Sequence, residues 1–405
     1  MPYLDHAATT PLREEALDAM LPWLREEYGN ASSQHGPGRR ARVAVENARK
    51  AVAAVLGCEP AEVLFTSGGT EADNAALRGA LGPLAPEART GLVTSAAEHD
   101  AILRTAEAWR EAGHAVAVVP PLASGAADPE GLAAATSETT GLVSAMLVNN
   151  EVGAVSDITR IAADAHRAGA LVHTDAVQAP GLLPLAVDAL GVDLLSLSAH
   201  KVNGPKGIGA LFVRAGTAFA PSVHGGAQER GRRGGTENVA AIVGFATALT
   251  LAEQEREETY ARLSRLRQRL AAQIRAALPE AVFNTADATE GESPSSPEAS
   301  GALDPQNAIP TAPHILSVSF PPGPHGPLDG EMILLGLDLA GVHASAGSAC
   351  TSGALTPSHV LLAMGVPRET AAATVRFSLG RTTTEADIDA ASSALAAVVR
   401  RARGV

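Results

Sequence analysis

The chain has 405 residues, of which 46% are hydrophobic and 19% are charged, and its formal net charge is −13. This length and apolar content predict a large buried core and two domains. The excess of negative charge disfavours nucleic acid and anionic membranes as partners, and no apolar run is long enough to cross a bilayer. We therefore expect small molecules and proteins as partners.

The amino terminus and the cysteine content indicate the cellular environment. The first six residues have neither the basic region nor the apolar run of a signal peptide. The two cysteines, Cys58 and Cys350, are too few for a disulfide framework or an all-cysteine metal site. We therefore expect a soluble protein of the reducing cytoplasm, without a resident metal ion.

Helical patterns alternate with short apolar runs from about residue 40 to residue 250. Residues 39–56 place apolar side chains on one helical stripe, and Gly57 predicts where that helix ends. The predicted strands are 63–66, 91–95, 115–119, 142–148, 171–173, 194–198 and 208–213. Nearly continuous apolar strands separated by helices predict a mainly parallel sheet that is covered on both faces. Such a sheet binds ligands beyond the carboxyl ends of its strands.

The remaining residues predict a smaller α+β domain. Residues 253–277 have the pattern of a long amphipathic helix that links the two domains. Residues 284–313 are rich in serine, proline, alanine and acidic side chains, which predicts an exposed, poorly ordered insertion. A strand at 314–320 follows, and residues 384–387 match the cap of a last helix.

The order of these elements predicts an α/β fold with a division into two parts. The large α/β domain is assigned to residues 15–255. The small α+β domain is assigned to residues 1–14 together with 256–405.

Two charged residues follow buried strands of the predicted sheet. Lys201 comes just after the strand 194–198, and Asp175 ends the strand that begins at residue 171. A lysine at a buried strand end can form a Schiff base with an aldehyde, and a carboxylate can hold a pyridinium nitrogen protonated. Taken singly, Lys201 is more typical of a side chain that extends to solvent, and Asp175 of a turn or helix cap. The two together, at the ends of separate parallel strands, favour the Schiff-base interpretation.

Gly68, Gly69 and Thr70 stand between a strand and a helix, where free N–H groups suit a phosphate. An ordinary helix cap would use the same residues. No Walker sequence occurs, and no Gly-x-Gly-x-x-Gly follows a strand, which argues against nucleotide binding.

Cys350 lies among small residues, in the sequence SAGSACTSG at 345–353. Such a stretch predicts an exposed loop whose thiol can act as a nucleophile. Cys58 follows an amphipathic helix and is interpreted as a structural residue.

Six motifs, in order along the chain, resemble those of the cysteine desulfurases. This family belongs to the class V aminotransferase group of the fold-type I pyridoxal-phosphate enzymes. The motifs are DHAATT (5–10), TSGGTEADN (66–74), VNNEVG (148–153), SAHK (198–201), GPKG (204–207) and RFSLGR (376–381). Residues 346–353 resemble the long catalytic loop of the housekeeping and nitrogenase-associated members. The resemblance covers nearly the whole chain except the insertion.

The resemblance implies that pyridoxal 5′-phosphate is the cofactor and assigns its ligands. It implies a Schiff base on Lys201 and a contact from Asp175 to the pyridine nitrogen. His99 would stack on the ring and move protons, although without the family it would be interpreted as a capping or core histidine. Gln178 and Asn150 would face the phenolic oxygen and the substrate carboxylate. The implied phosphate ligands are Gly69, Thr70, Ser198, His200 and, from the neighbouring subunit, Thr236.

The resemblance also implies the reaction. L-cysteine would be the substrate, with its carboxylate bound by Arg376, and its sulfur would pass to Cys350 as a persulfide while L-alanine is released. Read alone, Arg376 in an apolar strand is equally compatible with a buried ion pair.

The implied partners are a second copy of the chain and a sulfur-acceptor protein such as an iron–sulfur scaffold. Cys350 would, at most, ligate an iron–sulfur cluster transiently. We expect no direct contact with nucleic acid or membrane. The arginine-rich loop 230–235 lacks the interleaved aromatic residues of a nucleic-acid module.

Two residues depart from the family pattern, and two other functions remain open. His6 stands where tyrosine is usual, and His314 stands where asparagine often follows proline. A related pyridoxal-phosphate lyase or aminotransferase, including a selenocysteine lyase, would share Lys201 and Asp175 but would not need Cys350. A non-catalytic binding protein would have no use for a Schiff-base lysine.

Overall fold

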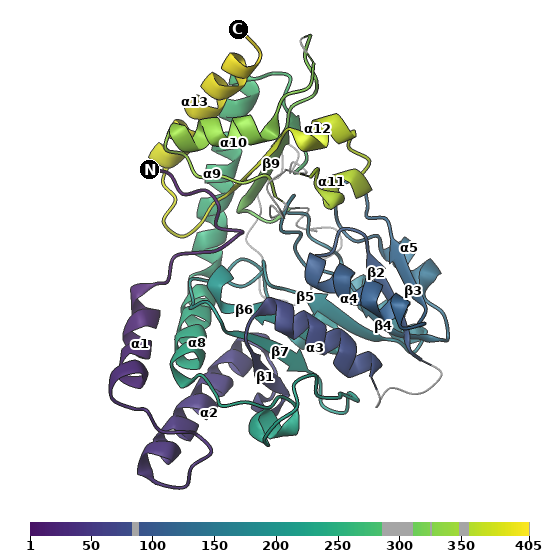
Figure 1. The fold of residues 1–405 in the computed structure, drawn as a ribbon, viewed down its shortest axis with the longest axis vertical. Helices are drawn as coiled ribbons and strands as arrows, with labels where there is room; N and C mark the ends of the chain where they lie inside the picture. Colours follow the sequence, from purple (N-terminus) through teal and green to yellow (C-terminus); the bar gives the residue numbers. More distant parts are fainter. Residues whose placement is uncertain (83–88, 286–310, 325, 348–355, 405) are drawn as a thin grey trace.

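The structure is a computed structural model that describes residues 1–82, 89–285, 311–324, 326–347 and 356–404. The described residues form two β-sheets, and one lies above the other along the long axis of the molecule (Figure 1). The larger sheet has seven strands and the smaller has three. Cys350 and most of the predicted insertion lie outside the described residues.

The seven strands of the large sheet lie in the order β1-β7-β6-β5-β4-β2-β3. Their bounds are β1 (Val63–Thr66), β2 (Gly91–Ser95), β3 (Val116–Val119), β4 (Thr140–Ser144), β5 (Leu171–Asp175), β6 (Leu194–Ser198) and β7 (Gly209–Val213). Only β7 is antiparallel to its neighbours β1 and β6, so the prediction of a mainly parallel sheet is confirmed. Parallel neighbours bring their carboxyl ends to one edge, where the candidate site residues follow.

Helices cover both faces of this sheet because successive strand residues point to opposite sides. Val63 and Phe65 pack in a core with α2, α6 and α8, whereas Leu64 between them packs with α3 and α4 on the other face. The helices of this part are α1 (Glu14–Arg25), α2 (Gly36–Leu56), α3 (Gly69–Leu81), α4 (Asp100–Glu111), α5 (Pro129–Ala135), α6 (Ile158–Arg167), α7 (Val187–Leu190) and α8 (Val239–Gln254). The helix predicted at 39–56 is therefore confirmed as α2, and Gly57 ends it with a φ of 65°.

The small sheet is antiparallel, and its strands are β8 (Val282–Phe283), β9 (Ile315–Ser319) and β10 (Thr374–Ser378). The helices of this part are α9 (Arg256–Ala277), α10 (Gly330–Leu339), α11 (His359–Ala363), α12 (Arg368–Ala372) and α13 (Glu385–Ala402). A separate core joins β9 and β10 to α9, α10 and α13. The predicted cap of the last helix is present, since Thr384 and Asp387 bond each other's backbone N–H groups.

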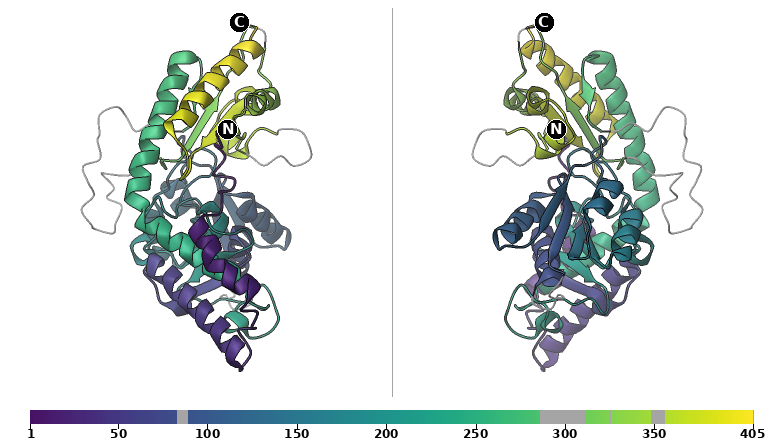
Figure 2. Two further views of the ribbon diagram at one scale, coloured as in Figure 1. Left: turned by 90° about the vertical axis from the view of Figure 1, so that its left-hand side faces the viewer. Right: turned by 90° about the vertical axis from the view of Figure 1, so that its right-hand side faces the viewer.

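The amino-terminal segment joins the two parts. Leu4 is buried in the core of the small sheet, and isolated bridges pair Tyr3 with His343 and Asp5 with Ser378. The chain then runs down to α1, which lies beside α8 (Figure 1). In the two side views of Figure 2, α8 and α9 follow one another along one side of the molecule. Residues 1–10 therefore cross from one sheet to the other, directly past Lys201.

Three predicted boundaries were wrong. The strand predicted at 142–148 ends at Ser144, because the N–H of Ser156 bonds Leu147 and Val155 pairs with Val148 in a turn. The helix predicted at 253–277 is the end of α8 followed by α9. The two helices meet at Glu255, whose backbone is shared as C-cap and N-cap and whose carboxylate binds Arg13 at 2.9 Å.

The third boundary is that of the predicted insertion. Its ends at 284–285 and 311–313 are buried, not exposed. Asn284 donates to the Ser319 hydroxyl at 2.7 Å, and the N–H of Ser317 donates to Thr285 at 2.8 Å. Ala312 donates to the Gly153 carbonyl at 2.7 Å. Tertiary hydrogen bonds therefore extend the ordered core into a stretch whose composition alone suggested a loop. Among the described helices, none is long and apolar enough to span a membrane.

The remaining insertion is expected to be dispensable for folding. Replacing residues 287–308 by a short Gly-Ser linker removes few apolar side chains and leaves the buried residues at both ends in place. Because loop-closure entropy depends weakly on length, the free energy of unfolding should change by less than about 1 kcal/mol. Thermal unfolding of the purified deletion protein measures this, and insoluble protein would show that the segment contributes to the core.

Candidate active site

The site lies at the carboxyl edge of the large sheet, where β5 and β6 run parallel. Asp175 is the last residue of β5 and pairs in register with Ser196 of β6. β6 ends at Ser198, and a single turn of 3-10 helix then carries the chain from Ala199 to Lys201. Asp175 and Lys201 therefore lie at or just after the carboxyl ends of adjacent strands, at the same edge of the sheet.

The Lys201 amine is held by backbone carbonyls of the amino-terminal segment. Its Nζ donates to Ala7 at 2.5 Å and to Ala8 at 2.8 Å. Burial, and secondarily the positive charge of Arg376, lowers its pKa to about 8, although Asp175 and Asp5 act in the opposite direction. A lysine with such a pKa is about one-tenth neutral at pH 7, far more than an ordinary lysine, and the neutral amine is the nucleophile for an aldehyde.

The Asp175 carboxylate is 6% exposed and accepts the N–H of Val177 at 2.9 Å. Burial raises its pKa, whereas His99 and Lys201 lower it through their charges. His99 caps α4, because its Nδ1 accepts the N–H of Ala101 at 3.1 Å. The capping interpretation of His99 thus describes its local structure, and with Nδ1 as acceptor the proton of the neutral ring lies on Nε2.

A close approach of three elements forms a cradle at the start of α3. A Cβ placed on Gly69 would lie 3.0 Å from Cγ2 of Val177 and 3.4 Å from Cβ of Ser198. A side chain here would have to push Val177 aside by a few tenths of an ångström, so glycine lets the start of α3 approach the end of β6 closely. Thr70 is exposed beside Gly69. His200 pairs its Nδ1 with the Thr9 hydroxyl at 3.1 Å, and burial lowers the pKa of its ring to about 4.

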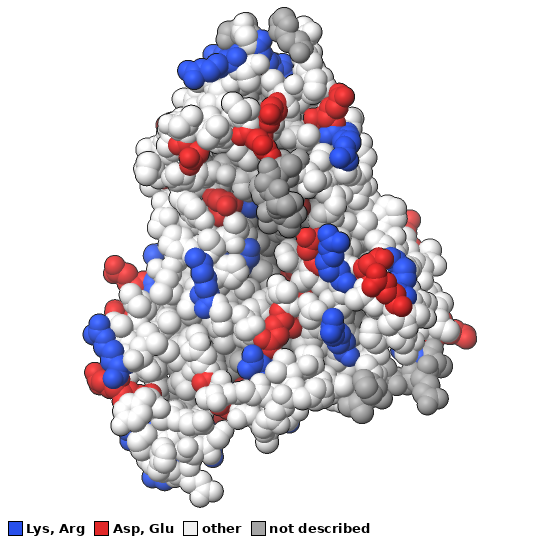
Figure 3. Space-filling model, in the orientation of Figure 1, with Lys and Arg blue, Asp and Glu red and all other residues white. Residues whose placement is uncertain are grey.

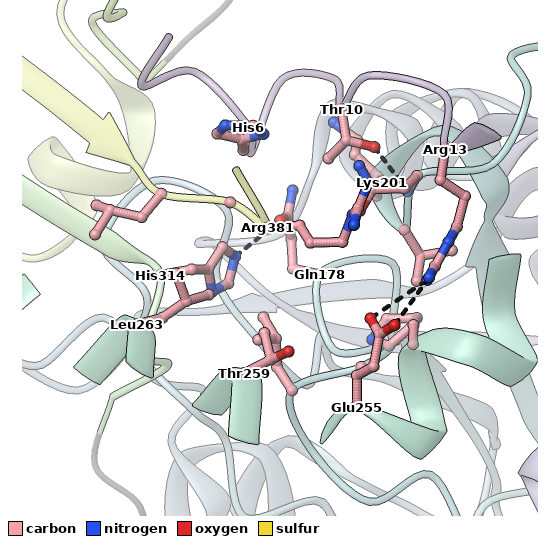
Figure 4. Close-up of a pocket in the computed structure, with 18 residues that line it drawn as sticks. His6, Thr10, Arg13, Gln178, Lys201, Glu255, Thr259, Leu263, His314 and Arg381 are labelled. Carbon is pink, nitrogen blue, oxygen red and sulfur yellow. Dashed lines mark hydrogen bonds and ion pairs between the residues drawn. The ribbon is translucent and has the colours of Figure 1, made fainter. Parts of the chain in front are cut away.

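Gln178 links the site to the small sheet. Its amide nitrogen donates to the Ala7 carbonyl at 2.9 Å, and its amide oxygen lies 3.3 Å from Nε2 of His314 (Figure 4). Both His6 and His314 are buried, and burial lowers their pKa values to about 4 and about 3 respectively. The two departures from the family pattern therefore contribute neutral rings near Gln178. They border a cavity of about 60 Å³ that Lys201 also lines.

Arg376 of β10 connects the two parts of the molecule. Its guanidinium donates to the Asn150 carbonyl at 2.8 Å and to the Gly347 carbonyl at 3.2 Å, and it forms an ion pair with Asp5 at 2.8 Å. The side chain is 4% exposed. The buried ion pair that the sequence left open for Arg376 is therefore present, with Asp5. The Nε of Arg376 is a further donor without a partner among the described residues.

Not every candidate joins this group. Thr236 is exposed in the loop before α8, and its side chain makes no hydrogen bond to another described residue. Asn150 reaches Arg376 through its carbonyl, so its amide is uncommitted in the described structure. Cys350 lies outside the described residues. Cys58 packs against the large core, and burial raises the pKa of its thiol to about 12, which fits the structural interpretation.

Sequence reasoning missed three acidic residues near these groups. Asp73 and Glu98 are fully buried, and burial raises the pKa of each well above its usual value, with the charge of Asp175 adding to the effect. Glu151 is 4% exposed and lies close to Arg376. Asp73 and Glu151 stand within motifs that carry the resemblance, and Glu98 directly precedes His99, but nothing in their spacing shows that they are buried.

Comparisons with known proteins give this geometry a family. A model of the aminotransferase class-V family matches residues 2–296. A cysteine desulfurase of Cereibacter sphaeroides is 44% identical over 405 residues, covering 100% of this chain and 97% of that protein. The cysteine desulfurase IscS of Dictyoglomus turgidum is 40% identical over 403 residues, covering 100% and 95%. The solved structure of a NifS-like protein superposes with a TM-score of 0.86 at 34% identity and covers 99% of both chains. The chain therefore belongs to the class-V aminotransferase family and, within it, to the cysteine desulfurases.

Proposed function

We propose that this protein removes sulfur from L-cysteine, releases L-alanine and carries the sulfur as a persulfide on Cys350. One observation supports this most directly. Lys201 follows the strand next to Asp175 and lies close to Arg376, and burial lowers the pKa of its amine to about 8. These residues have this arrangement in a chain that belongs to the cysteine desulfurases. The family is generally dependent on pyridoxal phosphate.

The residues present fit that cofactor. A half-buried amine and a buried carboxylate follow neighbouring strands at one edge of the sheet, which suits the aldehyde and the pyridine nitrogen of the cofactor. The glycine cradle at Gly69 exposes helix N–H groups, which suit a phosphate. The Nε of Arg376, which has no partner among the residues that the structure describes, can donate to a carboxylate.

Each ligand of the cofactor is assigned on this basis. Lys201 would bind the aldehyde carbon, Asp175 the pyridine nitrogen and Gln178 the phenolic oxygen, while His99 would lie on the ring. The phosphate ligands would be Gly69, Thr70, Ser198, His200 and Thr236 of the partner subunit. When bound, the cofactor withdraws electrons from the carbon of the attached amino acid.

The residues of the chain then position the substrate and move its protons. Arg376 would bind the carboxylate of cysteine, assisted by the Asn150 amide. The neutral Lys201 amine can take a proton at Nζ from the substrate α-carbon. His99 can hold or release a proton at Nε2, because its Nδ1 already accepts the N–H of Ala101.

Sulfur transfer needs a nucleophile from another element. The Cys350 thiolate attacks the sulfur of cysteine, a new S–S bond forms and the Cβ–S bond breaks with its electron pair remaining on the carbon side. The carbon skeleton takes up protons and leaves as L-alanine. One cysteine and one thiol thus become one alanine and one persulfide, without an external oxidant.

Mass spectrometry of the cofactor-loaded protein after treatment with cysteine tests this function. We expect a gain of one sulfur on the peptide that contains Cys350, together with one alanine for each persulfide. Alanine without that gain in mass would indicate a lyase that releases sulfide directly.

Partners and compartment remain predictions. We propose a homodimer, because Thr236 is exposed on each chain and is assigned to the neighbouring phosphate. The persulfide would be passed to an acceptor protein such as an iron–sulfur scaffold in the cytoplasm. On the face shown in Figure 3, basic and acidic side chains are scattered and mixed, so that face offers no basic patch for nucleic acid.

A further inference from the structure

Glu151 is a buried carboxyl group that none of the assignments above uses. It follows Asn150 in a turn that Asn149 holds rigid. The side-chain oxygen of Asn149 accepts the N–H groups of Glu151 at 2.9 Å and of Val152 at 3.0 Å. The Asn149 amide donates in turn to the Ala97 carbonyl at 2.9 Å. The backbone of Glu151 is therefore fixed to the large sheet.

The Glu151 carboxyl group lies near the start of α11, one of the helices grouped with the small sheet. The hydroxyl of Ser358 lies close enough to this carboxyl group to lower its pKa, and it also caps α11 by accepting the N–H of Leu361 at 3.1 Å. Its Oε2 is buried and has no partner among the described residues. Burial raises the pKa of this carboxyl group, as does the charge of Asp100, while Ser358, His359 and Arg376 lower it.

Gly347 also lies close to the Glu151 carboxyl group. A Cβ on Gly347 would lie only 2.9 Å from Oε2 of Glu151, and the φ of this residue is 96°. A side chain would therefore be both strained and in collision. The Gly347 N–H donates to the Ser345 hydroxyl at 3.3 Å, and its carbonyl accepts from Arg376 at 3.2 Å.

Gly347 and Ser358 stand before and after Cys350 in the sequence. They are described residues on either side of 348–355, the segment that contains Cys350. Apolar contacts support the same junction, because Val360 and Leu361 of α11 pack against Val152. One carboxyl group fixed to the large sheet thus contacts the chain both before and after the thiol.

We propose that Glu151 is a positioning residue for sulfur transfer, which holds Gly347 and Ser358 beside Arg376 and so sets where Cys350 meets the substrate. This inference rests on the proposed function. Glu151 touches neither the substrate nor the cofactor in this assignment. Its loss should therefore impair the delivery of the thiol and leave the binding of cysteine intact.

The variants Glu151→Ala and Glu151→Gln separate positioning from general damage. Alanine removes the carboxyl group and with it the contacts to Gly347 and Ser358. Glutamine keeps one oxygen for Ser358 and places an amide NH₂ group beside Gly347. Two readouts are followed in the cofactor-loaded protein. The first is the absorbance change on titration with cysteine, and the second is the single-turnover rate at which Cys350 gains one sulfur, measured by mass spectrometry.

For Glu151→Ala we expect an unchanged half-saturation for cysteine and a persulfide rate lower by about 10-fold or more, since small misplacements of a reacting group are costly. Glutamine should restore the rate to within about 3-fold of the wild type. Alkylation of Cys350 by iodoacetamide in the cofactor-free protein should be faster in the alanine variant and normal in the glutamine variant.

A second pair of variants keeps the test decisive if Glu151→Ala does not fold. Ser358→Thr keeps the hydroxyl group, and Ser358→Ala removes it, so only the latter should slow the persulfide step. Unchanged persulfide rates in the folded alanine variants would overturn the positioning role. A wild-type protein that forms no persulfide would instead overturn the proposed function.

Discussion

Cys350→Ser is expected to lower alanine production from cysteine by about 10³-fold or more, the scale of loss seen when a covalent nucleophile is removed. A serine hydroxyl is un-ionised at neutral pH and is a poor acceptor of sulfur. The variant should still load pyridoxal phosphate and still show the absorbance change on adding cysteine, because Lys201, Asp175 and Arg376 are unaltered. Alanine release and the cofactor spectrum measured on the same sample separate binding from transfer.

Cys58→Ser is the matched control for this prediction. The Cys58 thiol is partly buried against the large core, and burial raises its pKa to about 12, so it carries little thiolate. This variant should retain wild-type turnover. Wild-type alanine production by Cys350→Ser would identify the protein as a different pyridoxal-phosphate lyase, such as a selenocysteine lyase that does not require a thiol.

Lys201→Ala is expected to abolish the covalent link to the cofactor. The wild-type protein should be yellow and should keep the cofactor through gel filtration, and borohydride reduction should fix it on the peptide that contains Lys201. The alanine variant has no amine at this strand end, so reduction should leave no pyridoxyl group on the protein. Alanine production should fall by about 10³-fold or more, because the same amine is assigned to the proton at the α-carbon.

Lys201→Arg controls for the loss of charge and of hydrogen bonds. Lys201 donates to the Ala7 and Ala8 carbonyls, and the alanine variant loses both bonds, on the order of 1 kcal/mol each. Arginine keeps a positive donor but forms no Schiff base. It should therefore resemble the wild type in thermal unfolding without cofactor and resemble Lys201→Ala in the reduction experiment. A pyridoxyl group on either variant would place the linkage at another lysine.

Local patterns in the sequence were sufficient for much of the fold. β1, β2 and β6 have the predicted bounds, since a short apolar run predicts a strand that helices cover on both faces of the sheet. α2 ends at Gly57 because a left-handed residue is needed there. Two of the three boundaries that failed lie where a distant segment alters the chain. Arg13 contacts Glu255 at the junction of α8 and α9, and Ser317 draws Thr285 into the small core.

The sequence by itself determined the order of the elements, the parallel sheet and the placement of Lys201 and Asp175 at strand ends, because these depend on period and on neighbouring residues. Only the tertiary structure decided what surrounds those residues. Residues 1–10 bring the Ala7 and Ala8 carbonyls to the lysine, Arg376 arrives from the other sheet, and Glu151 meets Gly347 and Ser358. Burial and long-range contacts set the pKa values and the hydrogen bonds of the site, and neither is encoded in the local spacing of residues.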